Sequence, residues 1–245
     1  MTDARPLGEG GAAGAPSAPR DAPSRASGPV RPAQAVGPVP PARAVGPVRP
    51  AQAVHPAPPV VVVAASAGGI DALAAVLGPL PRSFGAAVVV VQHLDPGRPT
   101  ALPAVLGRRV AMPVRLADDG DALRPGVVLV APPDRHIRLR PDGTVALSRE
   151  PRVNFVRPSA DLLFASAAAS HGDRVIAVVL TGTGHDASGG ALAVHEHGGA
   201  VLAQDPVTAA FAGMPAAAIA TGCVDAVLAL GEIGPAIAAL AAERS

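Results

Sequence analysis

Residues 60–69, VVVVAASAGG, decide the fold class of this 245-residue chain. Four valines and two alanines form a continuous apolar run of strand length, and continuous rather than alternating runs are typical of strands covered on both faces. Two glycines then permit a tight turn, and IDALAAVLGPL follows with helical spacing. A buried strand that leads through a glycine turn into a helix predicts the first unit of an α/β fold.

The same alternation continues to the end of the chain. Helical patterns occupy SADLLFASAAASHG, SGGALAVHEHGG, GMPAAAIATG and GEIGPAIAALAAERS. Further apolar runs stand at 86–91, 127–131, 175–180, 200–203 and 226–230. We therefore expect a doubly wound, mostly parallel sheet with helices on both faces, Rossmann-like in outline. The pattern loosens between 110 and 153, where PDGTVAL predicts a small antiparallel hairpin and hence a mixed sheet.

The first 58 residues differ from the rest in composition. They are rich in Pro, Ala and Gly, and the unit GPVRPAQAV at 28–36 returns as GPVPPARAV at 37–45 and unchanged at 46–54. Nine residues with several prolines are too few for a packed repeat, so we predict a disordered tail at 1–58 before a folded domain at 59–245. The functional alternative is a docking segment for a proline-reading partner.

Composition excludes several classes of function. A net charge of +1 and the absence of Trp and Tyr leave neither a basic surface nor a stacking platform for nucleic acid. No apolar run reaches the length of a membrane span, and the N-terminus lacks a secretory h-region, so we expect no membrane insertion and a cytoplasmic location. Cys223 alone forms neither a disulfide nor a zinc site, and HEH at 195–197 lacks metal-ligand spacing. No metal and no cofactor are expected.

Three of the apolar runs lead into side chains that suit nucleophilic catalysis: Ser66, His93 and Asp186. The carboxyl ends of parallel strands meet at one edge of a sheet, so residues far apart in sequence converge there. A serine hydroxyl needs a histidine as base, and the imidazole needs a carboxylate to orient it. The positions of Ser66, His93 and Asp186 after three apolar runs therefore predict a Ser-His-Asp triad. Taken singly, Ser66 also fits a helix N-cap, His93 a strand-end histidine, and Asp186 a cap of the helix that begins near Ala187.

The turns around these residues supply backbone donors for an oxyanion. Ala67 and Gly68 follow Ser66 directly, and Thr183 and Gly184 lie in the glycine-containing stretch LTGTGHDASGG before Asp186. Exposed N–H groups at such turns stabilise the negative charge that develops in acyl transfer. These four residues are the expected site-lining positions.

Six blocks of the chain, in order, resemble the catalytic domain of the chemotaxis protein-glutamate methylesterase family. By position the resemblance places the nucleophile on Ser66, the histidine on His93 and the aspartate on Asp186, and it suggests that Arg157 closes over the site. The blocks are AASAGGIDAL, VVVVQHLDPG, LADDGDALRPGVVLVAPPDRHI, RPSADLLF, VVLTGTGHDASGG and AQDPVTAAFAGMPAAAI.

The resemblance implies a serine hydrolase that demethylates glutamate methyl esters on a methyl-accepting chemoreceptor-type protein and in some members deamidates glutamine. The alternatives are an esterase or amidase with another substrate, and a catalytically altered interaction module. Ala67, Thr183 and His185 depart from residues common in the family, which bears on substrate preference. The first 58 residues hold only three acids and no strand pattern, so no receiver domain and no control by aspartyl phosphorylation are expected in this chain.

Overall fold

The computed structural model describes residues 58–94, 97 and 100–245 of the chain. The predicted tail and its nine-residue repeats lie, apart from Pro58, outside the described residues.

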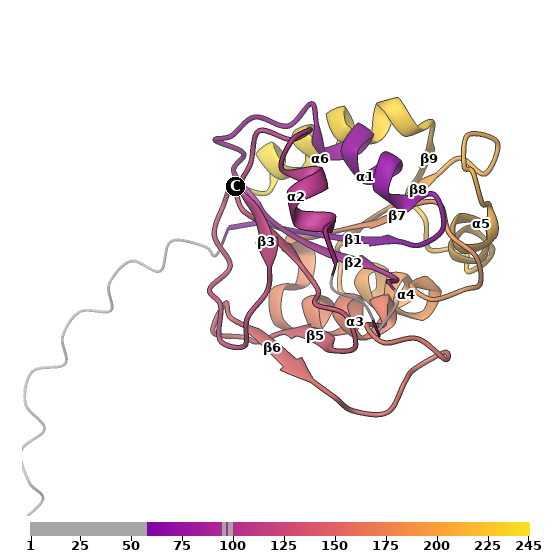
Figure 1. The fold of residues 1–245 in the computed structure, drawn as a ribbon. Helices are drawn as coiled ribbons and strands as arrows, with labels where there is room; N and C mark the ends of the chain where they lie inside the picture. Colours follow the sequence, from indigo (N-terminus) through magenta and orange to yellow (C-terminus); the bar gives the residue numbers. More distant parts are fainter. Residues whose placement is uncertain (1–57, 95–96, 98–99) are drawn as a thin grey trace, which may run out of the picture. The chain divides into compact units, whose positions relative to one another are not determined.

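Seven strands form one sheet in the order β3-β4-β2-β1-β7-β8-β9 (Figure 1). Every neighbouring pair in it is parallel, which confirms the predicted doubly wound sheet. The strands are rich in valine because β-branched side chains fit a pleated surface that is packed on both faces. Their bounds are β1 (Val60–Ala65), β2 (Ala87–Gln92), β3 (Val114–Leu116), β4 (Val128–Val130), β7 (Val175–Val179), β8 (Ala200–Gln204) and β9 (Ala226–Leu228).

Helices cover both faces of the sheet. Alternate residues of β1 feed two apolar layers: Val62 packs in the layer that contains Phe164, and Val63 in the layer that contains Leu73. The first layer includes residues of α3 (Ala160–His171), α4 (Ser188–Glu196) and α5 (Gly213–Ala220). The second includes residues of α1 (Gly69–Leu77), α2 (Leu102–Leu106) and α6 (Leu230–Glu243). Figure 1 shows α1 and α6 on one side of the sheet and α3 on the other. No helix among the described residues has the length and apolar character needed to cross a bilayer.

The antiparallel hairpin forms as predicted, but the expectation of a mixed sheet is wrong. Strands β5 (His136–Leu139) and β6 (Val145–Ser148) make a separate two-stranded sheet. After β4 the chain turns at Asp134, which has φ of 57°. The Leu139 N–H then donates to the Ser166 hydroxyl of α3 at 3.0 Å, so this backbone donor is used by a helix side chain rather than by the main sheet. The short elements α2 and β3 were not predicted.

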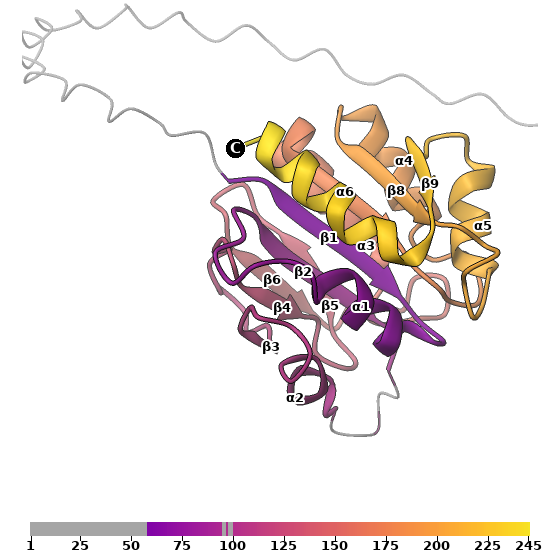
Figure 2. The same ribbon diagram turned by 90° about the horizontal axis from the view of Figure 1, so that it is seen from above.

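The position of β1 determines where the site lies. It is the middle strand, with β2, β4 and β3 on one side and β7, β8 and β9 on the other (Figure 2). The chain passes from β1 through α1 to β2 and returns later to β7 on the opposite side of β1. The crevice beyond the carboxyl ends of strands at such a switch point is where open α/β sheets bind ligands.

Candidate active site

The clearest feature at this edge is a hydrogen bond between His93 and Asp186. The His93 Nε2 atom lies 2.9 Å from Asp186 Oδ2, although 93 positions separate the two residues in sequence. His93 follows β2, and Asp186 lies in the loop between β7 and α4. The pairing predicted from strand ends alone is therefore present. Asp186 is 4% exposed, which strengthens the interaction because little solvent screens it.

Asp186 lies at the N-terminus of α3. Its carboxylate accepts hydrogen bonds from the Ala160 N–H at 2.6 Å, the Asp161 N–H at 3.2 Å and the Ser159 hydroxyl at 2.7 Å. The free N–H groups of a helix N-terminus favour a negative charge. Burial raises the pKa of the Asp186 carboxyl, but the hydrogen bonds from His93, Ala160 and Ser159 lower it, and the resulting pKa lies below the ordinary value. The alternative of a cap for the helix that follows Asp186 is wrong, because the N-cap of α4 is Ala187, without a side-chain cap.

Ser66 occupies the turn directly after β1. Its N–H donates to the Thr181 carbonyl oxygen at 3.0 Å, which ties the turn to the end of β7. The N-cap alternative is wrong here too, because α1 begins at Gly69 with Gly68 as N-cap and no side-chain cap. Gly68 has φ of 73°, a left-handed conformation that glycine adopts without steric cost.

Ser66 and His93 lie at neighbouring strand ends. Strands β1 and β2 run in parallel with Ala65 opposite Gln92, and the His93 N–H donates to the Ala65 carbonyl oxygen at 3.1 Å. Both side chains are partly buried. Within the described part of the chain the Ser66 hydroxyl makes no hydrogen bond. The structure thus joins His93 to Asp186 and places Ser66 beside them without a bond between Ser66 and His93.

The predicted donor residues flank Ser66 on two loops. A Cβ atom added to Gly182 would lie 2.8 Å from the Ser66 Cβ, so the loop that carries Thr183 and Gly184 touches the turn at Ser66. The Thr181 hydroxyl donates to the Ala67 carbonyl oxygen at 3.0 Å and fixes that turn from the other side. No acceptor within the described segments takes the backbone N–H of Ala67, Gly68, Thr183 or Gly184.

Two side chains at the site were missed by sequence reasoning. The buried Gln92 donates through Nε2 to the carbonyl oxygens of Ser66 at 2.8 Å and His93 at 3.2 Å. Ser159, also buried, donates to Asp186. The sequence held a signal for Gln92: it ends a strand whose other residues are all apolar, and a buried polar side chain needs a hydrogen-bond partner.

Arg157 lies near the site but is held by other groups. Its guanidinium donates to Asp134 at 3.0 and 2.6 Å and to the carbonyl oxygens of Arg149 and Glu150. Together with His93 it lines a depression of about 110 Å³, whose other walls are Leu94, Arg152, Phe155 and Val156. Arg157 therefore lies at the edge of the site, and its closure over the site stays a prediction.

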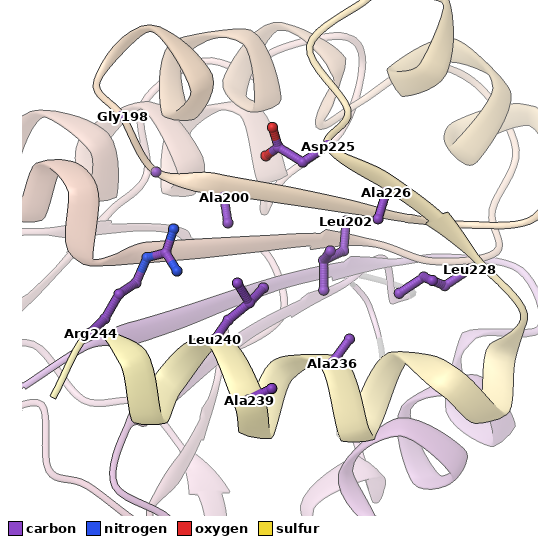
Figure 3. A pocket seen from close by; sticks show the side chains of 11 residues that line it. Gly198, Ala200, Leu202, Asp225, Ala226, Leu228, Ala236, Ala239, Leu240 and Arg244 are labelled. Carbon is purple, nitrogen blue, oxygen red and sulfur yellow. The ribbon is translucent and has the colours of Figure 1, made fainter.

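A larger cavity, of about 480 Å³, lies between α6 and the strands β8 and β9 (Figure 3). Its walls are mostly apolar, with Leu202, Leu228 and Leu240 between helix and sheet. Its charged side chains have partners: Asp225 accepts the Val201 N–H at 2.7 Å, and Arg244 donates to the Asp173 carbonyl oxygen at 2.9 Å. No predicted site residue lines it, so the candidate chemistry lies at the carboxyl edge beside β1.

Comparison with known proteins finds relatives of one kind. A curated protein-glutamate methylesterase/protein-glutamine glutaminase of Burkholderia lata is 42% identical over 182 residues, 74% of this chain and 54% of that protein. A protein of the same name from Anaeromyxobacter dehalogenans is 44% identical over 178 residues, 73% of this chain and 52% of that protein. The chain thus spans about half the length of these relatives. A putative protein of that name from Leptospira interrogans, 38% identical, is covered over 90% of its length by 71% of this chain.

A solved structure has the same fold. The crystal structure of the Thermotoga maritima CheB methylesterase catalytic domain superposes with a TM-score of 0.72 at 36% identity, covering 75% of this chain and 98% of that one. The model of the family described as CheB methylesterase matches residues 61–237, most of the described part of the chain. With a match of this extent and a shared architecture, the chain belongs to the CheB methylesterase family.

Proposed function

We propose that this chain is a serine hydrolase of the cytoplasm that removes methyl groups from glutamate methyl esters on a methyl-accepting chemoreceptor-type protein. The observation that carries the proposal is the buried hydrogen bond between His93 and Asp186, at 2.9 Å, next to a serine on the adjoining strand end. Membership of the CheB methylesterase family, and relatives that are named protein-glutamate methylesterases, support the choice of reaction.

The first half of the reaction forms an acyl-enzyme. The Ser66 Oγ atom attacks the carbonyl carbon of the ester while His93 takes the hydroxyl proton. Because Nε2 of His93 lies against Asp186, Nδ1 is the ring nitrogen left to accept that proton. The bond to the methoxide then breaks, His93 returns the proton, and methanol leaves. Asp186 keeps the His93 imidazole oriented and stabilises the charged imidazole. Because the pKa of the Asp186 carboxyl lies below its ordinary value, the carboxylate stays ionised throughout.

Backbone N–H groups would stabilise the oxyanion formed in this step. Ala67 and Gly68 follow the nucleophile, Thr183 and Gly184 lie on the loop that touches it, and all four N–H groups are without acceptors in the described structure. Each donor of this kind is worth roughly 3 kcal/mol to the transition state in characterised hydrolases. These donors come from two glycine-containing segments, the turn after Ser66 and the loop at 182–184.

The second half restores the enzyme. Water attacks the acyl carbon with His93 as base, the bond to Ser66 Oγ breaks, and glutamate is released with the proton returned to the serine. The same acyl-enzyme forms from a glutamine side chain with ammonia as the leaving group, which is the second activity in the names of the relatives. Neither half requires a metal or a cofactor.

The test is methanol release from a methylated receptor protein. The Ser66→Ala variant removes the nucleophile, and Ser83→Ala serves as a matched control because Ser83 is an exposed serine in the connection between α1 and β2, at the opposite edge of the sheet. Wild type and Ser83→Ala should release methanol at equal rates, and Ser66→Ala should lose activity by several orders of magnitude. Equal rates in all three would remove Ser66 from its role.

A non-catalytic interaction module is the second candidate, favoured by the family departures at Ala67, Thr183 and His185 and by the repeats at 28–54 as a docking segment for a proline-reading partner. A serine-reactive phosphonate separates the two candidates. Stoichiometric labelling at Ser66 that is lost in His93→Gln supports the enzyme, whereas absence of labelling in wild type supports the module. Measuring ammonia beside methanol decides between deamidation and demethylation.

A further inference from the structure

Phe155 is an exposed aromatic side chain beside the candidate active site. It is 94% exposed, although large apolar side chains are normally buried, and it lines the same depression as His93. It belongs to the connection between β6 and α3. An apolar group of this size in water contributes nothing to the core of the domain.

The backbone that carries Phe155 is a tight turn in an unfavourable conformation for its sequence. Val153 and Val156 exchange two backbone hydrogen bonds, at 3.2 and 3.0 Å, around Asn154 and Phe155. Both central residues have positive φ, 51° and 65°, as in a type I′ turn, where glycine is strongly preferred at the second position. Phenylalanine at that position is a backbone outlier, and outliers of this kind cluster at functional sites.

Hydrogen bonds hold the residues on both sides of Phe155, and one of them leads to Asp186. Asn154 donates to the Asp161 carboxylate at 2.7 Å, and the Asp161 N–H donates to Asp186 at 3.2 Å. On the other side Arg157 donates to the carbonyl oxygens of Arg149 at 3.1 Å and Glu150 at 2.8 Å. Phe155 is therefore presented from a frame fixed relative to Asp186.

Exposed arginines lie in the segments next to the turn: Arg149 and Arg152 precede it in the chain, and Arg135 follows Asp134, the ion-pair partner of Arg157. Arg135, Arg149 and Arg152 are exposed, and their guanidinium groups have no partner in the described parts of the chain. The nearby acids are engaged, since Asp134 pairs with Arg157 and Glu150 with Arg138. The pKa of Asp134 lies below its ordinary value, first because of the hydrogen bond from Arg157 and further because of the charges of Arg149 and Arg152. Arg149 and Arg152 therefore lie near Asp134.

We infer that Phe155 and these three arginines, the docking rim, determine substrate specificity by binding an acidic polypeptide segment with an apolar side chain next to the ester. The inference rests on the proposed function. An exposed aromatic side chain with arginines nearby can bind a partner that carries negative charges and an apolar side chain. Binding to the docking rim would lower KM for such protein substrates. Ser66 and His93 would still carry out the reaction at the acyl group.

The test uses synthetic peptides that contain one glutamyl methyl ester and differ only in the flanking residues, which are glutamates, glutamines or lysines. For wild type we expect kcat/KM for the acidic peptide to exceed that of the neutral one about tenfold, and the basic peptide to be the poorest substrate. The triple variant Arg135→Gln, Arg149→Gln and Arg152→Gln should reduce this range to about twofold. Arg82→Gln, an exposed arginine before β2 at the opposite edge of the sheet, is the matched control and should keep the wild-type range.

Phe155→Gly tests the apolar contact separately from folding. Glycine relieves the left-handed backbone, so the thermal midpoint should stay equal or rise, whereas a structural role for Phe155 requires it to fall. With acidic peptides that carry leucine or alanine beside the ester, wild type should prefer leucine about tenfold through KM, and Phe155→Gly should lose that preference. Val227→Ala, which shortens an exposed apolar side chain on β9, is the matched control and should keep it.

The outcomes separate the two proposals. If wild type releases methanol from the peptides but the charge order and the leucine preference persist in the variants, the docking rim is wrong and the proposed function stands. If wild type hydrolyses none of the peptide esters but releases methanol from a methylated receptor protein, the docking rim is wrong and the proposed function stands. If it acts on neither, the proposed function fails, and the inference with it. Loss of both preferences with methanol release retained supports the inference.

Discussion

The Nε2 atom of Gln92 donates a hydrogen bond of 2.8 Å to the carbonyl oxygen of Ser66. The same atom donates to the carbonyl oxygen of His93 at 3.2 Å, so one buried amide joins the two strand ends that carry the candidate nucleophile and base. Its Oε1 atom has no hydrogen-bond partner within the described residues, and a Cβ atom on Gly69 would lie 2.1 Å from it. The helix after Ser66 therefore begins with a glycine because the Gln92 side chain fills the space.

Replacing Gln92 with methionine should misplace Ser66 relative to His93. Methionine has nearly the same length and fills the same space, but it leaves the His93 carbonyl oxygen without its donor and the Ser66 carbonyl oxygen with the Gly69 N–H alone, at 2.9 Å. We therefore expect a loss of about 1–3 kcal/mol in the free energy of unfolding. The rate of methanol release should fall through kcat about tenfold or more, with little change in KM, because the acyl group still binds. Urea titration and steady-state kinetics measure the two effects. An unchanged kcat would show that the bridge does not position the nucleophile.

Ser159→Ala should weaken the support of Asp186. The variant removes one of four donors, so the Asp186 pKa should rise toward its ordinary value and the free energy of unfolding at pH 7 should fall by about 1–2 kcal/mol. A carboxyl whose pKa is depressed by folding stabilises the protein above its unfolded pKa, near about 4, and loses this contribution as the pH falls through the folded value. The cost of Ser159→Ala should therefore shrink between pH 7 and pH 3. Ser166→Ala, on the same helix but bonded to Leu139 and Leu163, should cost the same at both pH values.

The strands and the pairing of His93 with Asp186 were predictable because both follow from local rules. A continuous run of valines predicts a strand that is buried on both faces of a sheet, and the carboxyl ends of parallel strands lie at one edge of that sheet. These rules predict that the residues after β1, β2 and β7 lie near one another. They carry no information on the direction in which each side chain leaves its turn.

The remaining contacts depend on those directions. Ser159 and Asp186 are 27 positions apart and meet only because the N-terminus of α3 comes up to the loop after β7. Sequence proximity favoured α4 as the partner of Asp186, and the fold brings α3 closer. His136 shows the same dependence on packing: it stands among arginines in PPDRHIRLR, yet it is 0% exposed because β5 packs on α3.

Gly182→Ala should reduce the rate of methanol release about a hundredfold because the added methyl group has no room. The added Cβ atom would lie 2.2 Å from Met214 Sδ and 2.8 Å from Ser66 Cβ, so either the methionine or the turn at Ser66 must move. A displacement of about 1 Å at the reacting atoms costs on the order of a hundredfold in rate, and overpacking costs roughly 1–3 kcal/mol of stability. Gly231→Ala in α6 is the control, since nothing lies within 4 Å of its Cβ position, and it should raise stability by about 0.5 kcal/mol with normal methanol release. A fully active Gly182→Ala would show that the loop after β7 has room to shift away from Ser66.

Acid should destabilise the domain below about pH 6.5 partly through His136. Burial lowers the pKa of this imidazole, whose Nδ1 accepts the Ser159 N–H at 3.2 Å and whose Nε2 donates to the Pro151 carbonyl oxygen at 3.1 Å, with Arg138, Arg157 and Glu150 as the neighbouring charges. The unfolded chain takes up a proton near pH 6.5 and the folded one only at lower pH, so the free energy of unfolding is constant above that value and falls as the pH drops toward the folded pKa. His136→Gln should have a lower free energy of unfolding at pH 7, and that free energy should fall less steeply toward pH 5. Methanol release should also be slower, because the Ser159 N–H loses the His136 ring nitrogen as its acceptor. His171, whose pKa burial also lowers, is the matched control: His171→Gln should flatten the decline without changing methanol release. A His136→Gln profile parallel to that of wild type between pH 7 and pH 5 would mean that His136 does not titrate differently in the two states.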